Sequence, residues 1–144
     1  MKLRVRGDSL RFRLTQGEVV RLLAGNRVSE SVHFADGDVL TYSLQASENA
    51  AQVGAHFNGR EINVDLPQAA VSRWASGDDV GIEAAQPIGG GKRLHIVVEK
   101  DFRCLQPRPE EDERDNFPHP ENIAEEVAPS RPKTKESAHV SVSS

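Results

Sequence analysis

The chain has 144 residues, 37% of them hydrophobic, and a formal charge of −4, which fits one domain with a buried core. Its single cysteine excludes an internal disulfide, and no apolar run approaches the ~20 residues that cross a bilayer. The start of the chain lacks the apolar core of a secretory signal, so we expect a cytoplasmic protein with no membrane partner.

The charges are unevenly distributed along the chain. Residues 1–106 carry 13 basic and 13 acidic side chains, so the whole net negative charge lies in residues 107–144. Residues 1–27 hold seven bases and two acids, whereas residues 110–126 hold eight acids and one base. Blocks of opposite charge bear on solubility and partners rather than on fold.

The first elements expected are two strands, near residues 2–6 and 10–14, because apolar residues alternate with basic ones on both sides of a Gly-Asp turn. A short helix follows at about residues 16–24. Thr15 and Glu18 have the spacing of a capping box, and a Gly-Asn pair is typical of a helix end.

Alternation then predicts four more strands between residues 28 and 66, interpreted as an antiparallel meander that contains an Asn-Gly hairpin turn. Pro67 favours the start of a second helix, which would place Val71 and Trp74 on one face. A last hairpin over residues 80–98 completes the pattern.

The order ββ-α-ββββ-α-ββ predicts a single α+β domain over residues 1–106, with a mainly antiparallel sheet, twisted or curled towards a half-barrel, and two short helices. Residues 107–127 are predicted to form an acidic, proline-containing strap that packs on the core through Phe117. Burying a Phe contributes roughly 1.5–3 kcal/mol. Residues 128–144 contain too few apolar side chains to offset the entropy of ordering, which predicts a disordered tail.

Five basic side chains of the first two strands are expected to share one face of the sheet: Lys2, Arg4, Arg6, Arg11 and Arg13. Like charges on opposed strands are unfavourable without a counter-anion. The favoured anion is the acidic strap of the same chain, and the alternatives are an anionic small molecule or peptide, nucleic acid, or a merely solvated face. Nucleic acid is disfavoured because no aromatic side chain is expected on this face for stacking.

A divalent metal is a further hypothesis. Cys104, Asp115 and His119, with neighbouring acids, would offer a thiolate, a carboxylate and an imidazole. Their spacing matches no recognised metal pattern, and a free cysteine is more often a small core residue. Catalysis by Cys104 is disfavoured because the acids beyond it would raise the pKa of its thiol.

The opening "MKLRVRGDSLRFRLTQGEV", together with "VVEKDFRCL" and "EDERDNFPHP" further on, resembles a family of small, uncharacterised bacterial proteins described as a domain of unknown function. Its members open with K-[IL]-R-[IV]-[KR]-G and close with EKDF-x-CL. The resemblance covers residues 1–120 and implies no activity, cofactor or catalytic residue. Relatives are expected to carry Pro-Asn-Pro where this chain has Pro118, His119 and Pro120, which favours a turn over a ligating role for His119.

The sequence therefore predicts a non-enzymatic binding or accessory module, without a cofactor, whose basic sheet face is covered by its own acidic segment. The first alternative is a small metal-binding protein that uses Cys104 and His119. The second is an enzyme or binder that acts on an anionic ligand at the arginine-rich face.

Overall fold

The computed structural model describes residues 1–102 and 115–118. The elements in chain order are β1 (Lys2–Val5), β2 (Ser9–Leu14), α1 (Gln16–Leu23), β3 (Val28–His33), the 3₁₀ turn η1 (Ala35–Gly37), β4 (Val39–Ser47), β5 (Gly54–Phe57), β6 (Glu61–Pro67), α2 (Gln68–Ser76), β7 (Gly81–Gly89) and β8 (Lys92–Lys100). The predicted α+β class, element order and two short helices are confirmed. No helix in these two ranges is both long and apolar enough to cross a membrane.

The eight strands form two mixed sheets, with the orders β1-β2-β8-β7 and β3-β4-β6-β5. Each sheet consists of two antiparallel hairpins joined by a parallel pair at its centre, β2 with β8 and β4 with β6. The antiparallel meander expected over residues 28–66 does not form, because β4 pairs with β6 instead of β5. The central places go to the strands with the most deeply buried side chains, such as Leu44 on β4 and Val64 on β6.

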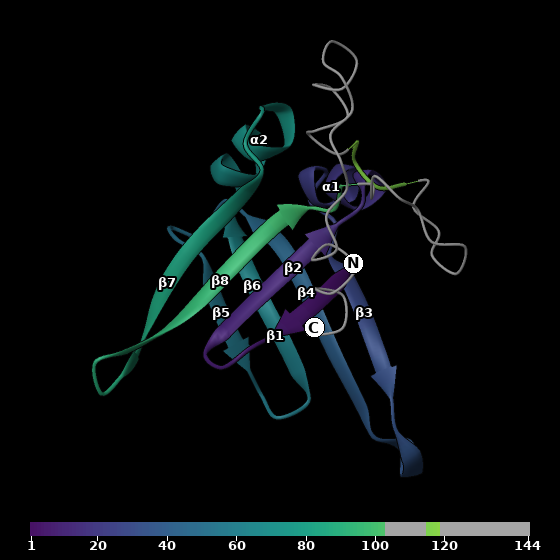
Figure 1. The fold of residues 1–144 in the computed structure, drawn as a ribbon, viewed down its shortest axis with the longest axis vertical. Coiled ribbons are helices and arrows are strands. Elements are labelled where there is room, and N and C mark those ends of the chain that lie inside the picture. Colours follow the sequence, from purple (N-terminus) through teal and green to yellow (C-terminus); the bar gives the residue numbers. More distant parts are fainter. Residues whose placement is uncertain (103–114, 119–144) are drawn as a thin grey trace, which may run out of the picture.

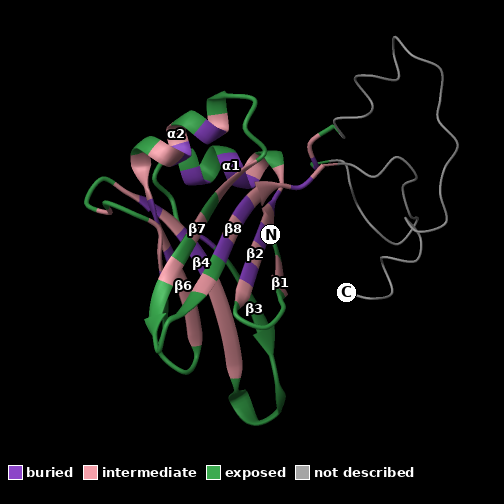
Figure 2. Ribbon diagram, turned by 60° about the vertical axis from the view of Figure 1, so that its left-hand side comes forward, coloured by how far each residue is buried: buried purple, intermediate pink, exposed green. Residues whose placement is uncertain are grey.

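The two sheets face each other, and α1 and α2 pack together across one end of them (Figure 1). Buried residues lie in alternate positions of the inner strands and on the facing sides of the helices (Figure 2). The core gathers Phe12 and Ile96 from the first sheet, Leu44 from the second, and Trp74 from α2. Neither sheet closes on itself as a barrel.

The capping box predicted at the start of α1 is present. The Thr15 N–H donates to Glu18 Oε1 at 3.0 Å, and the Glu18 N–H donates to Thr15 Oγ1 at 3.4 Å. These reciprocal bonds satisfy two amides that lack partners inside the helix. They mark the point at which the alternating pattern of β2 ends and α1 begins.

The chain is an internal repeat of the unit hairpin–helix–hairpin, β1-β2-α1-β3-β4 followed by β5-β6-α2-β7-β8. Exchanging the two units converts the strand order of one sheet into that of the other, so the units are related by an approximate twofold. In the first hairpins, Leu3 pairs with Phe12 and Ala55 with Val64, 52 positions later in each case.

The sequence repeats at the same spacing. Identical residues 52 positions apart include Leu14 and Leu66, Gln16 and Gln68, Val19 and Val71, Arg21 and Arg73, and Gly25 and Gly77. In the second hairpins Val28 pairs with Leu44 and Ile82 with Val98, a spacing of 54. Two more residues separate Gly77 from Ile82 than separate Gly25 from Val28, which accounts for the change.

Candidate functional site

Two cross-strand pairs of cations lie on the outer face of the first sheet. Lys2 is opposite Arg13, and Arg4 is opposite Arg11, in the antiparallel register of β1 and β2. The alternate residues of β2 are buried against the second sheet, so these side chains point outward. Arg6 is exposed in the turn that joins the two strands. We call the set the basic face: Lys2, Arg4, Arg6, Arg11 and Arg13.

Two carboxylates, one near the end of β8 and one directly after it, form ion pairs with three of these cations. Arg13 Nε donates to Glu99 Oε1 at 2.9 Å, and Arg11 Nη1 lies 3.6 Å from the same oxygen. Lys2 Nζ lies 3.3 Å from Asp101 Oδ2. Both arginine side chains keep 41% of their surface exposed, so they remain accessible to a further anion.

Asp115 and Asn116 contact the N-terminus of α1. The backbone N–H of Gln16 donates to the Asp115 carbonyl oxygen at 2.8 Å, and Gln16 Nε2 donates to the Asn116 carbonyl at 3.1 Å. The Asp115 carboxylate accepts hydrogen bonds from the Gly17 N–H. Asp115, considered above as a metal ligand, therefore caps a helix in this structure.

Phe117 lies beside the end of β8. Its N–H donates to the Asp101 carbonyl at 2.6 Å, and its ring packs on the core. The ring meets that of Phe102 edge to face at a centroid distance of 5.9 Å, and Lys100 Nζ lies 5.4 Å from its centroid. These contacts tie residues 115–118 to the end of the first sheet.

The remaining metal candidates, Cys104 and His119, lie outside the described residues, as does most of the predicted strap. Within residues 1–102 and 115–118, no three His, Cys, Asp or Glu side chains are grouped to hold a metal ion. The metal hypothesis stays a prediction.

The N-terminal amino group and nearby ionisable side chains join the edges of the two sheets near the start of the chain. The Met1 amino group lies 2.5 Å from Glu18 Oε2 and 3.4 Å from Glu30 Oε2. Glu30 is opposite Tyr42 in the register of β3 and β4. Burial, and then the charges of Glu30 and Glu18, raise the pKa of the Tyr42 phenol. These contacts connect β1, α1 and β3, which is a structural role.

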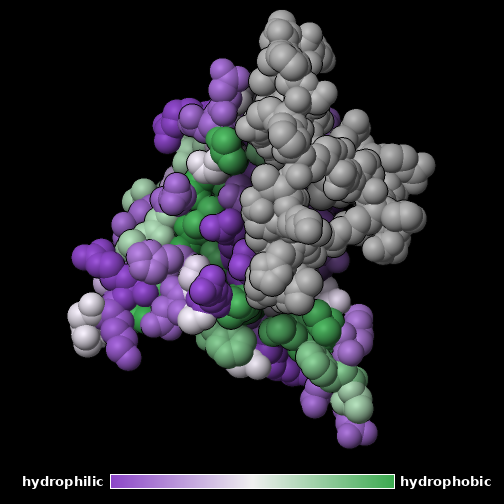
Figure 3. All heavy atoms as spheres, viewed as in Figure 1, coloured by the Kyte–Doolittle hydropathy of each residue, from purple (hydrophilic) through white to green (hydrophobic). Residues whose placement is uncertain are grey.

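The sheets end in exposed apolar side chains at the end opposite the helices. The exposed fractions are 62% for Val5, 60% for Phe34, 66% for Phe57 and 46% for Ile88. Val5 and Phe57 continue the inward-facing register of edge strands, as the pairings Val5–Leu10 and Phe57–Ile62 indicate. Phe34 directly follows β3, and Ile88 lies at the register shift near the end of β7. Apolar side chains gather at this end, next to the β3–β4 hairpin (Figure 3). We call these four residues the open end.

Sequence reasoning missed the open end. Alternation correctly indicates the face on which Phe34 and Phe57 lie, but not how far along the strands the core extends. The helices cover only one end of the sheets. The internal repeat is the sequence signal that could have indicated the open end. Val5 and Phe57 occupy equivalent positions 52 residues apart, and Phe34 and Ile88 occupy equivalent positions 54 residues apart.

Comparison with known proteins gives one result. A family model described as "Family of unknown function (DUF7009)" matches residues 1–121. No curated protein and no solved structure matches the chain.

Proposed function

The chain belongs to this family of unknown function, and from that premise we propose that it is a non-enzymatic module whose basic face binds an acidic peptide segment. The acidic residues of its own residues 107–127 compete for the same face. A cytoplasmic location, where reducing conditions would keep the single cysteine as a thiol, is part of the proposal.

The observation that carries the proposal is the opposition of Lys2 to Arg13 and of Arg4 to Arg11. Like charges directly opposite each other destabilise a sheet. A single carboxylate, that of Glu99, forms the ion pairs with both Arg11 and Arg13. Guanidinium groups bind carboxylates through two parallel N–H donors. A row of carboxylates would therefore relieve the repulsion between the pairs.

The chemistry of the face favours a peptide over nucleic acid. No Phe, Tyr or Trp lies at an outward-facing position of the four strands of this sheet, whereas single-stranded nucleic acids are bound largely by stacking on aromatic rings. Contacts at the start and within the acidic segment also favour a peptide ligand. Asp101, which precedes the segment, pairs with Lys2, and the Phe117 N–H donates to the Asp101 carbonyl beside the end of β8.

Tethering gives that segment an advantage over a free peptide. A short tether holds a ligand at an effective concentration of about millimolar, so an external peptide binds only when its affinity exceeds that competition. A single exposed ion pair contributes only about 0.2–1 kcal/mol, and such contacts exchange readily.

The test is fluorescence anisotropy with a labelled oligo-glutamate peptide at low salt. Neutralising the acidic segment in the full chain, with Glu110→Gln, Glu111→Gln, Asp112→Asn and Glu113→Gln, should tighten binding about tenfold, or ~1.4 kcal/mol. Arg4→Gln with Arg11→Gln should weaken binding at least as much. The matched control is Arg27→Gln with Arg73→Gln, which removes the same charge elsewhere on the surface.

The outcomes separate the parts of the proposal. If the peptide binds equally well without Arg4 and Arg11, the basic face is not the site. If neutralising the acids changes nothing while the arginine variant still fails, the face binds peptides but the chain does not compete. Tighter binding of an oligothymidylate than of the peptide would reject the ligand class.

A further inference from the structure

The open end is an apolar surface that nothing in the described ranges covers. Val5, Phe34, Phe57 and Ile88 lie at or just beyond the ends of the four edge strands, and 46–66% of each is exposed. Large apolar side chains grouped on one surface mark contact sites. The opposite end of the same two sheets is covered by α1 and α2.

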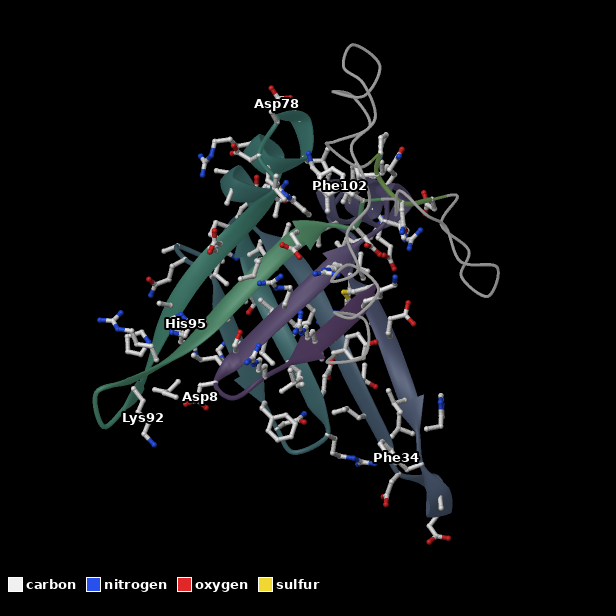
Figure 4. All side chains as sticks on the ribbon, viewed as in Figure 1. Asp8, Phe34, Asp78, Lys92, His95 and Phe102 are labelled. Carbon is white, nitrogen blue, oxygen red and sulfur yellow. The ribbon has the colours of Figure 1, made fainter. Side chains whose placement is uncertain are left out.

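The two long hairpins that frame the open end carry opposite charges. Asp36 and Asp38 lie in the β3–β4 turn, and Lys92 and Arg93 are the first two residues of β8, directly after the β7–β8 turn. All four side chains are exposed. The hairpins are equivalent in the internal repeat, so they lie at opposite corners of this end. Figure 4 shows this arrangement, with Phe34 at one corner and Lys92 at the other.

We propose that the open end is the interface of a homodimer in which two copies meet end to end about a twofold axis. When a second copy is turned over onto this end about an axis perpendicular to the line that joins the two corners, its basic corner lies opposite the acidic corner of the first. The same operation makes the second corner complementary as well. The apolar side chains of both copies then lie between two equivalent charged contacts, which makes the interface isologous, with an apolar centre and a polar rim.

This geometry favours a second copy over an unrelated partner. A different protein would need one basic and one acidic corner at matching spacing around an apolar centre. A second copy has them by symmetry. The proposal is independent of the basic face, which lies on the outer side of the first sheet.

The test measures the mass of the full chain in solution by sedimentation equilibrium at low salt, with two charge-reversed variants. The first carries Asp36→Lys and Asp38→Lys, so that both of its corners are basic. The second carries Lys92→Asp and Arg93→Asp, so that both are acidic. The wild type should have twice the chain mass, each variant alone the single mass, and an equimolar mixture twice the mass again.

A matched control reverses two exposed acids in the α2–β7 connection, Asp78→Lys with Asp79→Lys. It makes the same change in net charge and should remain dimeric. Phe34→Asp should weaken association at least tenfold while circular dichroism stays that of the wild type. Because the mixture must recover the dimer, simple misfolding of the variants cannot imitate the result.

Three results would overturn the proposal. The first is a wild type that stays monomeric up to about 1 mM, where even a 4 kcal/mol association is half formed. The second is a dimer that survives in each charge variant alone, which places the interface elsewhere. The third is an equimolar mixture of folded variants that stays monomeric.

Discussion

The Asp115 carboxylate accepts hydrogen bonds from the backbone N–H of Gly17, 98 positions earlier, at 3.1 and 3.3 Å. Gly17 lies in the first turn of α1, where N–H groups lack partners within the helix. A Cβ at position 17 would lie 3.0 Å from Asp115 Oδ2. The glycine is therefore what lets the distant carboxylate reach the helix.

This contact predicts a double-mutant cycle in the free energy of unfolding, measured with urea. Asp115→Ala should cost about 1 kcal/mol, as the loss of an N-terminal helix cap does. Gly17→Ala alone should give no gain, because the new methyl group crowds the carboxylate. In the Asp115→Ala background it should stabilise by about 0.5–1 kcal/mol, the usual advantage of alanine in a helix.

The control is Glu48→Ala, which removes an exposed acid from the β4–β5 connection and should change stability by less than ~0.5 kcal/mol. Equal effects of Gly17→Ala with and without Asp115 would mean that the two residues do not interact in solution.

Phe117→Ala should destabilise the protein by about 1.5–3 kcal/mol, because the ring packs on the core and against Phe102. Phe117→Leu keeps an apolar side chain but loses the ring contacts with Phe102 and Lys100, so it should cost less than the alanine variant. Urea unfolding of both variants checks the order. A Phe117→Ala protein as stable as the wild type would contradict docking of residues 115–118.

Gln86 connects the two sheets at their β5–β7 edge. The Ala55 N–H donates to Gln86 Oε1 at 2.7 Å, and Gln86 Nε2 donates to the Ala55 carbonyl at 3.1 Å. Gln86→Met keeps the volume but leaves two backbone groups unpaired, which should cost about 1–3 kcal/mol and speed hydrogen exchange at the Ala55 amide. Gln52→Met, at an exposed position, is the control. Unchanged exchange at Ala55 would show that the bridge is absent in solution.

Tyr42 should make the protein less stable in alkali. Burial raises the pKa of its phenol in the folded chain above the ordinary value of 10.0, so above pH 10 the unfolded chain loses its proton first. The free energy of unfolding should therefore be undiminished below pH 10 and fall as the pH rises towards the folded pKa. Tyr42→Phe should remove this component of the decline.

The direct measurement is simple because Tyr42 is the chain's single tyrosine, so phenolate absorbance reports this side chain alone. Its midpoint should lie above 10.0, and Glu30→Gln should lower it only in part, because burial is the larger cause and Glu30 the next. A midpoint at or below 10.0 in the folded protein would contradict the burial of the phenol.

Local signals predicted local structure well. The capping box placed the start of α1 at Gln16, and the Asn-Gly turn predicted the β5–β6 hairpin. The parallel pairs were beyond such signals, because Leu10 meets Ile96 only through the packing of distant hairpins. The basic pairs followed from alternation. The counter-charge at Glu99 did not, since it reaches Arg13 across that parallel pairing.

The repeat has a consequence for how the chain is assembled. Each unit contributes one hairpin to each sheet, and the central parallel pairs always join a strand of one unit to a strand of the other. Neither unit can complete a sheet alone. The chain is therefore arranged like a dimer of two half-length protomers that residues 48–53 join into one chain. The central parallel pair of each sheet is the boundary between the two halves. Cleavage in that connection would therefore leave two fragments that fold only by recombining.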